Sequence, residues 1–343
     1  MRLDATPCLA YFVRRGMESH GKVKSGMTIR PQQGHGYTLI LLHRRNAESD
    51  FKKIADRIER RAPDIVIVTG TLGANEALPP AVWARPTLTV ALGSFRLEIK
   101  RGLVYRCQRV LKDKQFEHYR AAGIDTPLTA RFRLGMELDP GLWGDHVVLK
   151  PMHINSHGEG IHLVRTGRVS ALTPENFPQD HPIHKDEYLV QQFIDTGEYP
   201  CHYRVVSFFG EAISFRRNFM TIKRPPLDAD DETLMRGNIV SNFEAEAGAT
   251  ELSNDAEILA FARRMHAAQP GVPLQGLDIL RDMRNGKLYA LESNCGGNTW
   301  GFSSEMGEKA RRFFGGAGPM IRQFNAWDTA ADALIKRTRA EAR

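Results

Sequence analysis

One cluster of residues has the types and spacing to bind a polyphosphate. Lys150 ends a predicted strand at 146–150, and a loop that contains Ser156, Gly158 and Gly160 follows it. Backbone N–H groups in such a loop can donate to phosphate oxygens, and a lysine ammonium adds a point charge among them. The Walker pattern does not occur here. A loop with two glycines can also be a simple turn, which is the alternative for this cluster taken by itself.

A second cluster could bind a metal ion. Asp278 lies on one arm of a predicted hairpin, and Glu292 and Asn294 lie on or just after the other arm. Because hairpin arms run side by side, the two carboxylates can face each other, and they would repel unless a cation lay between them. Oxygen ligands of these types suit Mg²⁺. The alternative is surface acids paired with Arg281 or Lys287, but both acids lie in apolar runs, where unpaired carboxylates are costly.

Basic residues lie between these two clusters along the chain. They are Arg204 on a predicted strand, the neighbours Arg216 and Arg217, and Arg236 with Asn238. Arginine stabilises phosphate or carboxylate charge through forked hydrogen bonds. For any one of them, the alternative is a solvated side chain at the edge of a sheet.

Strands and helices that follow from hydrophobic periodicity must position these clusters. The first third of the chain is typical of a βαβ unit, with strands at 37–43 and 64–69 around a helix at 47–62 and a further strand at 86–92. The rest is rich in strands, predicted at 146–150, 161–164, 188–194, 203–209, 212–215, 277–281 and 288–292. Helices are expected at 114–122, 255–268, 304–314 and 327–343. The Pro-rich, acidic segment 225–232 is expected to be a mobile surface loop.

The composition is that of an ordinary folded protein. The 343 residues predict about two domains, and 42% hydrophobic with 25% charged residues exclude a disordered chain. A net charge of +7 is modest, and no aromatic–basic interleaving indicates nucleic-acid binding. No apolar run is long enough to span a bilayer, no signal peptide is evident, and four widely spaced cysteines indicate reduced thiols. We expect a cytoplasmic protein without nucleic-acid or membrane partners, and whether it forms a homo-oligomer stays open.

Taken in chain order, segments from about Lys112 to Asn298 resemble the ATP-grasp superfamily. They are 112–116 with 122–127, 148–151 with the loop after it, 189–194, 203–205, 236–238, 276–280 and 291–294. The resemblance is closest to the branch of ribosomal-protein glutamate ligases and related amino-acid ligases, which share the order Arg-x-Asn, Gly-x-Asp-Ile-Leu, Glu-x-Asn. No segment is specific alone, but their common order is hard to obtain by chance.

The resemblance implies a fold of α/β and α+β parts. Residues 1–110 would form an N-terminal α/β domain of the kind that precedes an ATP-grasp fold. Residues 111–200 would form the first ATP-grasp subdomain, with the lysine, the triphosphate loop and the adenine hinge. Residues 201–343 would form the second subdomain, with the metal-binding hairpin and the C-terminal helices. ATP would lie between these two subdomains.

The resemblance also implies roles for individual residues. ATP would be held by Lys114, Lys150, Ser156, His157, Gly158 and Gly160 at the phosphates and by Gln191, Gln192, Phe193 and Ile194 at the adenine. The metal ligands would be Asp278, Glu292 and Asn294, which would hold Mg²⁺, with Mn²⁺ as an alternative ion. Arg204, Arg217, Arg236 and Asn238 would be catalytic.

The reaction implied is an ADP-forming ligation of a carboxylate to an amine through an acyl phosphate. Its partners would be ATP and small-molecule substrates, such as amino acids or peptides. Two alternatives from other classes remain: an ATP-grasp phosphotransferase with a different acceptor, and a non-catalytic nucleotide-binding protein that retains the fold.

Three smaller features have functional and structural interpretations. His153 and His157 could bind zinc, although no third ligand is visible, and His157 could instead contact phosphate. Cys295 could be a nucleophile, but a small packed thiol is the better interpretation because no histidine partner is evident. The segment 296–299 is either a loop that contacts the acceptor substrate or a turn.

Overall fold

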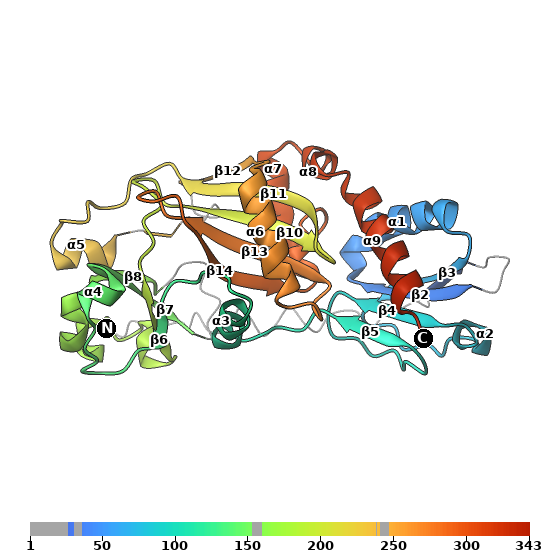
Figure 1. Cartoon of the computed structure of the whole chain (residues 1–343), viewed down its shortest axis with the longest axis horizontal. Helices are drawn as coiled ribbons and strands as arrows, with labels where there is room; N and C mark the ends of the chain where they lie inside the picture. The colour runs from blue at the N-terminus through green and yellow to red at the C-terminus, as the bar shows by residue number, and fades with distance from the viewer. Residues whose placement is uncertain (1–26, 31–35, 153–159, 238, 241–246) are drawn as a thin grey trace, which may run out of the picture.

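The computed structural model describes residues 27–30, 36–152, 160–237, 239–240 and 247–343. Its strands form three sheets, of which the first is mixed and the other two are antiparallel. The predicted combination of an α/β part with α+β parts is therefore confirmed. The sheets follow one another along the long axis of the molecule, with the third sheet between the other two (Figure 1).

The first sheet contains the predicted βαβ unit. Its strands are β1 (Met27–Arg30), β2 (Tyr37–His43), β3 (Ile65–Thr71), β4 (Thr87–Ala91) and β5 (Leu103–Arg106), in the order β1-β3-β2-β4-β5. The helices of this region are the 3-10 turn η2 (Arg45–Ala47), α1 (Glu48–Arg61) and α2 (Pro80–Trp83). Helix α1 forms because Phe51, Ile54 and Ile58 recur at helical spacing, and all three are buried against the sheet. The sequence patterns did not identify the outer strands β1 and β5.

The second sheet carries Lys150. Its strands are β6 (Thr129–Arg131), β7 (His146–Pro151), β8 (His162–Arg165) and β9 (Tyr188–Gln192), in the order β6-β9-β7-β8. Short helical segments surround it: α4 (Pro140–Trp143), η3 (Thr166–Ala171), η4 (Pro174–Asn176), η5 (Pro182–His184) and α5 (Asp231–Arg236). Strands β7 and β8 pair antiparallel, which confirms the strands predicted at 146–150 and 161–164 and joins them in a hairpin.

The segment 225–232, predicted to be a mobile surface loop, is a surface loop as far as Asp230, and its last two residues belong to α5. Its backbone carbonyls are bound by side chains of the second sheet: His146 binds the oxygen of Leu227, and Arg165 donates to those of Asp228 and Ala229. Asp230 then caps α5, which begins at Asp231 and packs on β8. The Pro-rich composition indicated a loop, and the hydrogen bonds that fix it come from strands that are far away in the sequence.

The third sheet carries the acidic hairpin. Its strands are β10 (Cys201–Phe208), β11 (Glu211–Met220), β12 (Gly248–Leu252), β13 (Leu274–Arg281) and β14 (Leu288–Cys295), in the order β12-β11-β10-β13-β14. Helices α3 (Lys112–Ala121) and α6 (Ala256–Ala267) pack on one face through a shared apolar cluster. The chain continues through η6 (Gly297–Thr299), η7 (Glu305–Gly307), α7 (Glu308–Phe313), α8 (Gly318–Gln323) and α9 (Ala326–Glu341).

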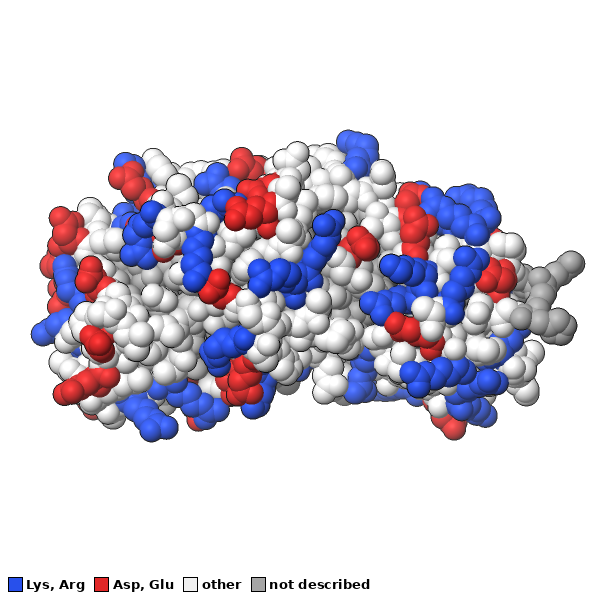
Figure 2. Space-filling view, viewed as in Figure 1, with Lys and Arg blue, Asp and Glu red and all other residues white. Residues whose placement is uncertain are grey.

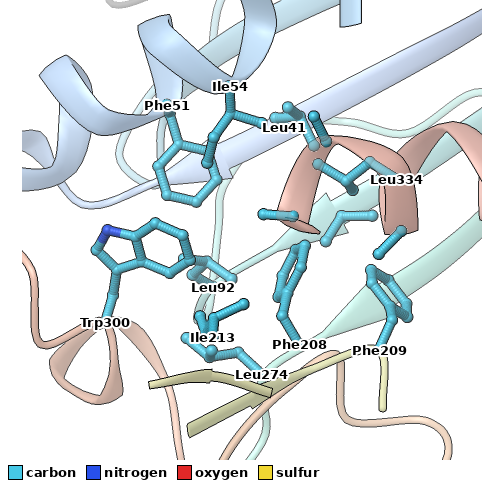
Figure 3. Packing of buried hydrophobic residues seen from close by; sticks show 14 of the residues in the cluster. Leu41, Phe51, Ile54, Leu92, Phe208, Phe209, Ile213, Leu274, Trp300 and Leu334 are labelled. Atoms are coloured by element: carbon cyan, nitrogen blue, oxygen red, sulfur yellow. The ribbon is translucent and has the colours of Figure 1, made fainter. Parts of the chain in front are cut away.

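One apolar core joins the first and third sheets. In Figure 3, Leu41 and Phe51 from the first sheet region lie close to Phe208 and Ile213 from the third, and Leu334 of α9 lies beside them. The second sheet has a separate core. Helix α9 packs on α1 as well as on β11, and α3 packs on β14, so both helices connect regions that the sequence assigns to different domains.

The surface charges are mixed. Figure 2 shows basic and acidic side chains interspersed over the visible face, without one dominant basic patch. Within the described part of the chain, none of the helices has both the length and the apolar character that crossing a bilayer requires.

Candidate functional site

A cleft of about 500 Å³ lies where the second sheet faces the third. Strands β7 and β9 provide one wall, and β10, β11, β13 and β14 provide the other. Because side chains alternate between the faces of a strand, every second residue of the third sheet points into the cleft. These residues are His202, Arg204, Arg216, Asn218, Gly276, Asp278, Leu280, Glu292 and Asn294.

Lys150 is buried at the end of β7. Its Nζ donates to Oε1 of Gln191 at 2.8 Å and lies 5.7 Å from the centre of the Phe116 ring. Burial lowers the pKa of the Lys150 ammonium to about 7; the charge of Lys112 adds to this shift, and the carboxylate of Glu292 opposes it. An anion that enters the cleft would therefore stabilise the charged ammonium form of Lys150.

The apolar end of the cleft is at the end of β9. Phe193 and Ile194 line it together with Val148, Ile161, Leu280 and Leu291. The backbone N–H of Gln192 donates to the oxygen of Leu128 at 2.8 Å, which holds this segment against β6. A flat heterocycle suits such a surface.

Asp278 and Arg204 form a partly buried ion pair through two hydrogen bonds. Nε of Arg204 donates to Oδ1 of Asp278 at 2.6 Å, and Nη2 donates to Oδ2 at 2.5 Å. The two residues are also opposite each other in the β10–β13 ladder. The alternative partners considered for the acids are engaged elsewhere: Arg281 with Asp255, and Lys287 with Asp125.

Glu292 faces Asp278 across the hairpin, as the sequence predicts. The register shifts after this pair, because Ile279 lies opposite Ala290 and Leu291 becomes the additional residue of a β-bulge. Nδ2 of Asn294 donates to Oε1 of Glu292 at 2.9 Å and to Oδ2 of Asp278 at 3.1 Å. The bulge adds one residue to the β14 arm between the turn and Glu292, and the Asn294 amide links the two acids.

His202 and Asn218 extend this polar network. Nδ2 of Asn218 lies 2.9 Å from Nε2 of His202, whose ring is 3.7 Å from Oδ1 of Asp278. Thr250 donates to Oδ1 of Asn218 at 2.8 Å and thereby fixes the orientation of the amide. Sequence analysis missed both residues because an isolated His or Asn on a strand carries no spacing signal.

The cleft brings together most of the predicted residues that the structure describes. They are Lys150, Gln191, Gln192, Phe193, Ile194, Arg204, Asp278, Glu292 and Asn294. Gly160 lies near its edge with φ +70°, and a Cβ there would come within 2.6 Å of the Tyr188 hydroxyl, so this position requires glycine. Ser156, His157, Gly158 and Asn238, and also His153, lie outside the described residues.

Two predicted basic residues point away from the cleft for geometric reasons. Arg217 follows Arg216 on β11 and therefore projects from the opposite face, where it pairs with Glu251. Lys114 lies on the exposed side of α3, where Nζ contacts Glu117 at 2.7 Å, whereas Lys112 enters the cleft. The Nζ of Lys112 lies 3.9 Å from Oε2 of Glu292.

Arg236 is likewise not brought to the cleft. Its exposed side chain pairs with Glu232 one turn earlier in α5. Arg224, which sequence analysis missed, does line the cleft; it donates to Asp195 at 3.1 Å and lies 5.8 Å from the Phe193 ring.

The three predicted metal ligands lie together in the cleft. Among the described residues, no group of three His, Cys, Asp or Glu side chains could hold a metal ion, and the predicted set consists of two carboxylates and one amide. Both Asp278 oxygens accept from Arg204, so Glu292 is the more open carboxylate. The Asn294 amide now turns its Nδ2 towards the two acids. Rotation of the amide would place its Oδ1 there instead, and an amide oxygen is a ligand that a hard cation binds.

Cys295 and the segment after it also border the cleft. Burial raises the pKa of the Cys295 thiol, which favours a packed thiol over a nucleophile. The segment after it forms η6, and Asn298 and Thr299 line the cleft. Arg44, which follows β2, packs over Gly297 and donates to Oδ1 of Asn298 at 2.8 Å. The first sheet region therefore contacts the segment 297–299 directly.

No protein-family model matches the sequence, and no curated protein matches it. Among solved structures, D-cycloserine synthetase aligns at 11% identity and a TM-score of 0.47, covering 88% of this chain and 99% of the other. A D-alanine–D-alanine ligase from Bacillus anthracis aligns at 14% and 0.43, covering 89% and 98%. A RiPP-associated ATP-grasp ligase from Chryseobacterium gregarium, in complex with ADP and a leader and core peptide, aligns at 10% and 0.49, covering 88% and 97%. These likenesses are distant in sequence.

Proposed function

We propose that this protein is an ATP-dependent carboxylate–amine ligase of the ATP-grasp type. The observation that carries the proposal is the lining of the cleft. Its described residues include five cationic side chains and two carboxylates, Asp278 and Glu292, next to an apolar end. This combination suits a nucleotide. Its base would pack at the apolar end, its phosphates would contact the cationic side chains, and the carboxylates would bind the accompanying metal ion.

In this proposal ATP lies between the second and third sheets. The adenine contacts Phe193, Ile194 and the apolar side chains around them. Lys150 and Lys112 neutralise the phosphates, so Lys112 takes the role that sequence analysis gave to Lys114. The chain divides accordingly into an N-terminal domain of residues 1–110 and subdomains of residues 111–200 and 201–343.

Asp278, Glu292 and Asn294 would hold Mg²⁺ at the phosphates. The bound ion would neutralise charge on the phosphate oxygens as the phosphoryl group moves. Arg204 holds Asp278 in place from the neighbouring strand. Arg216, which is buried on the face that lines the cleft, takes the role that sequence analysis gave to Arg217.

The reaction would take place in two balanced steps. An oxygen of the substrate carboxylate attacks the γ-phosphorus of ATP, its bond to ADP breaks, and an acyl phosphate forms. An amine nitrogen then attacks the acyl carbon, inorganic phosphate leaves with the C–O bond electrons, and the amine proton passes to solvent or to phosphate. Arg204 and Arg216 stabilise the negative charge that develops during both steps.

An assay of ADP formation tests this proposal. With Mg²⁺ and ATP, a panel of amino-acid and peptide pairs should release ADP and phosphate in equal amounts, and mass spectrometry should detect the amide. Glu292→Gln should lower the rate about 100-fold or more because the most open metal-binding carboxylate is lost. Glu257→Gln makes the same chemical change on the exposed side of α6 and should leave the rate unchanged.

Two results would contradict the proposal. If the protein binds Mg²⁺ and ATP but releases no ADP with any pair, it is a nucleotide-binding protein rather than a ligase. If ADP is formed while the phosphoryl group stays on a hydroxyl acceptor, it is a phosphotransferase. Unchanged turnover in Glu292→Gln would remove the metal assignment.

A further inference from the structure

Gln115 makes an unusual contact between helix α3 and the acidic hairpin. Its side chain binds the backbone of Ser293 at two points: the N–H of Ser293 donates to Oε1 at 2.7 Å, and Nε2 donates to the oxygen of Ser293 at 2.9 Å. Nε2 also donates to the oxygen of Val110 at 2.8 Å. Both hydrogens and the oxygen of the amide are therefore used, which fixes its orientation.

The position of Ser293 makes this contact significant. Strand β14 is at the edge of the third sheet as the described residues form it, and on its outer side the N–H of Ala290 donates to the oxygen of Asp125 at 2.9 Å. The amide of Gln115 binds the N–H and C=O of one residue there, as a partner strand would. Gln115 is 4% exposed, and its loss would leave two polar backbone groups buried without these partners.

The contact also joins two groups of the proposed site. Ser293 lies between Glu292 and Asn294 in β14, while Lys112 is one turn before Gln115 in α3. The Nζ of Lys112 is 3.9 Å from Oε2 of Glu292. Apolar packing of Phe116 and Tyr119 holds α3 against the sheet, but the hydrophobic effect itself is not directional. Two hydrogen bonds to one residue define a register.

We propose that Gln115 is a positioning residue for the metal and phosphate site. It sets the register of α3 on β14 and thereby fixes Lys112 relative to Glu292 and Asn294. This inference rests on the proposed function, because it assigns these three groups to a nucleotide with its metal ion. Nothing in the sequence resemblance assigns a role to Gln115.

The test measures binding of ADP by calorimetry over a range of Mg²⁺ concentrations, without turnover. Gln115→Met keeps the length and burial of the side chain but cannot make the hydrogen bonds. The Mg²⁺ concentration needed for half of the gain in ADP affinity should rise about tenfold or more. ADP binding without Mg²⁺ should change less, because the adenine end is formed by β9 and the strands around it.

Ile258→Ala is the matched control for a loss of stability. Ile258 is buried in α6, in the same apolar cluster as α3, and does not line the cleft. It should lower the melting temperature at least as much as Gln115→Met while leaving the Mg²⁺ dependence unchanged. If both variants show the same Mg²⁺ dependence as the wild type, the inference is wrong.

A second variant keeps the inference testable if Gln115→Met does not fold. Gln115→Glu retains the acceptor for the N–H of Ser293 and loses the donor to its C=O, so it should also raise the Mg²⁺ requirement. A wild-type Mg²⁺ dependence in this variant would overturn the inference. Failure of the proposed function has a different signature: the wild-type protein itself would show no Mg²⁺-dependent ADP binding.

Discussion

Lys150 has a pKa near neutrality because it is buried before any anion arrives. The shift follows from desolvation, helped by Lys112, and a polyphosphate would reverse it by placing negative charge beside the ammonium. Nucleotide binding should therefore raise the pKa of Lys150 and take up a proton. The effect should be largest between the pKa of about 7 in the free protein and the usual value near 10.5.

Calorimetry in two buffers with different ionisation enthalpies measures this proton uptake. At about pH 8, ADP binding should take up close to one proton more in the wild type than in Lys150→Arg, because arginine stays charged in both states. Any protons that the nucleotide itself takes up or releases on binding contribute equally in both proteins, so they cancel in the difference between wild type and variant. Equal uptake in the two proteins would show that Lys150 does not titrate on binding.

At the residue scale, the sequence indicated which types of residue form the candidate site, but not which face of a strand each side chain occupies. The motif order pointed to Lys150, Arg204 and the acidic hairpin, and the structure brings all of them together. The resemblance gave the catalytic role to Arg217, but the face that Arg216 and Arg217 each occupy depends on the pairing of β11 with β10. The contact of His202 with Asn218 likewise depends on the pairing of β10 with β11, which places the two residues opposite each other.

At the scale of elements, two histidines hold short segments of the second sheet region together. Nδ1 of His162 lies 2.7 Å from the oxygen of Met235 in α5, and its Nε2 lies 2.7 Å from Nε2 of His181. Nδ1 of His181 accepts from the N–H of Ile183 at 3.1 Å. These partners require both rings to be neutral: His162 carries its proton on Nδ1, and His181 carries its proton on Nε2.

Mild acid should therefore destabilise the protein. Burial lowers the pKa of His162, and it lowers that of His181 to about 4 with help from the charges of His162 and His184. The unfolded chain binds protons below about pH 6.5 while the folded state does not, so stability is lost as pH falls from about 6.5 towards 4. Buried His266, with a pKa also lowered to about 4, contributes in the same direction.

Melting temperatures measured between pH 7.5 and 4.5 test this dependence. His181→Gln removes one titrating ring and should flatten the decline, although it should also lower the melting temperature at neutral pH. The slope left in that variant comes from the other titrating groups, including His162, His266 and the paired carboxylates Asp64 and Asp282. A decline as steep as in the wild type would exclude His181 as a source of the pH dependence.

Prediction of elements succeeded where periodicity was strong and failed where tertiary pairing decides. The hairpin of β13 and β14 follows from two apolar runs on either side of Asn285-Gly286, a dipeptide typical of hairpin turns, and its register places Asp278 opposite Glu292. Strands β1 and β5 are four residues long and lie at the edges of the first sheet, so each exposes part of its surface. Their hydrophobic pattern is correspondingly weak.

At the scale of the whole molecule, the three sheets form two packing units. The first and third sheets share one core with α9, whereas the second sheet has its own. Leu334→Ala opens a cavity in the shared core and should cost about 2–5 kcal/mol. Hydrogen exchange should show reduced protection in β2, β4, β10 and β11 together, with β7 and β9 unchanged. Loss of protection confined to the first sheet would contradict a shared core.

The position of α9 has a consequence for how the protein is made. Residues 326–341 complete a core whose first strand is at residues 37–43, and Arg57 of α1 pairs with Asp328 at 3.0 Å. While the chain emerges from the ribosome, the first sheet region must wait with an unfilled apolar surface until nearly the last residues of the described chain have been synthesised. We expect the second sheet region, whose core draws mainly on residues 130–190, to reach its native form earlier in the nascent chain.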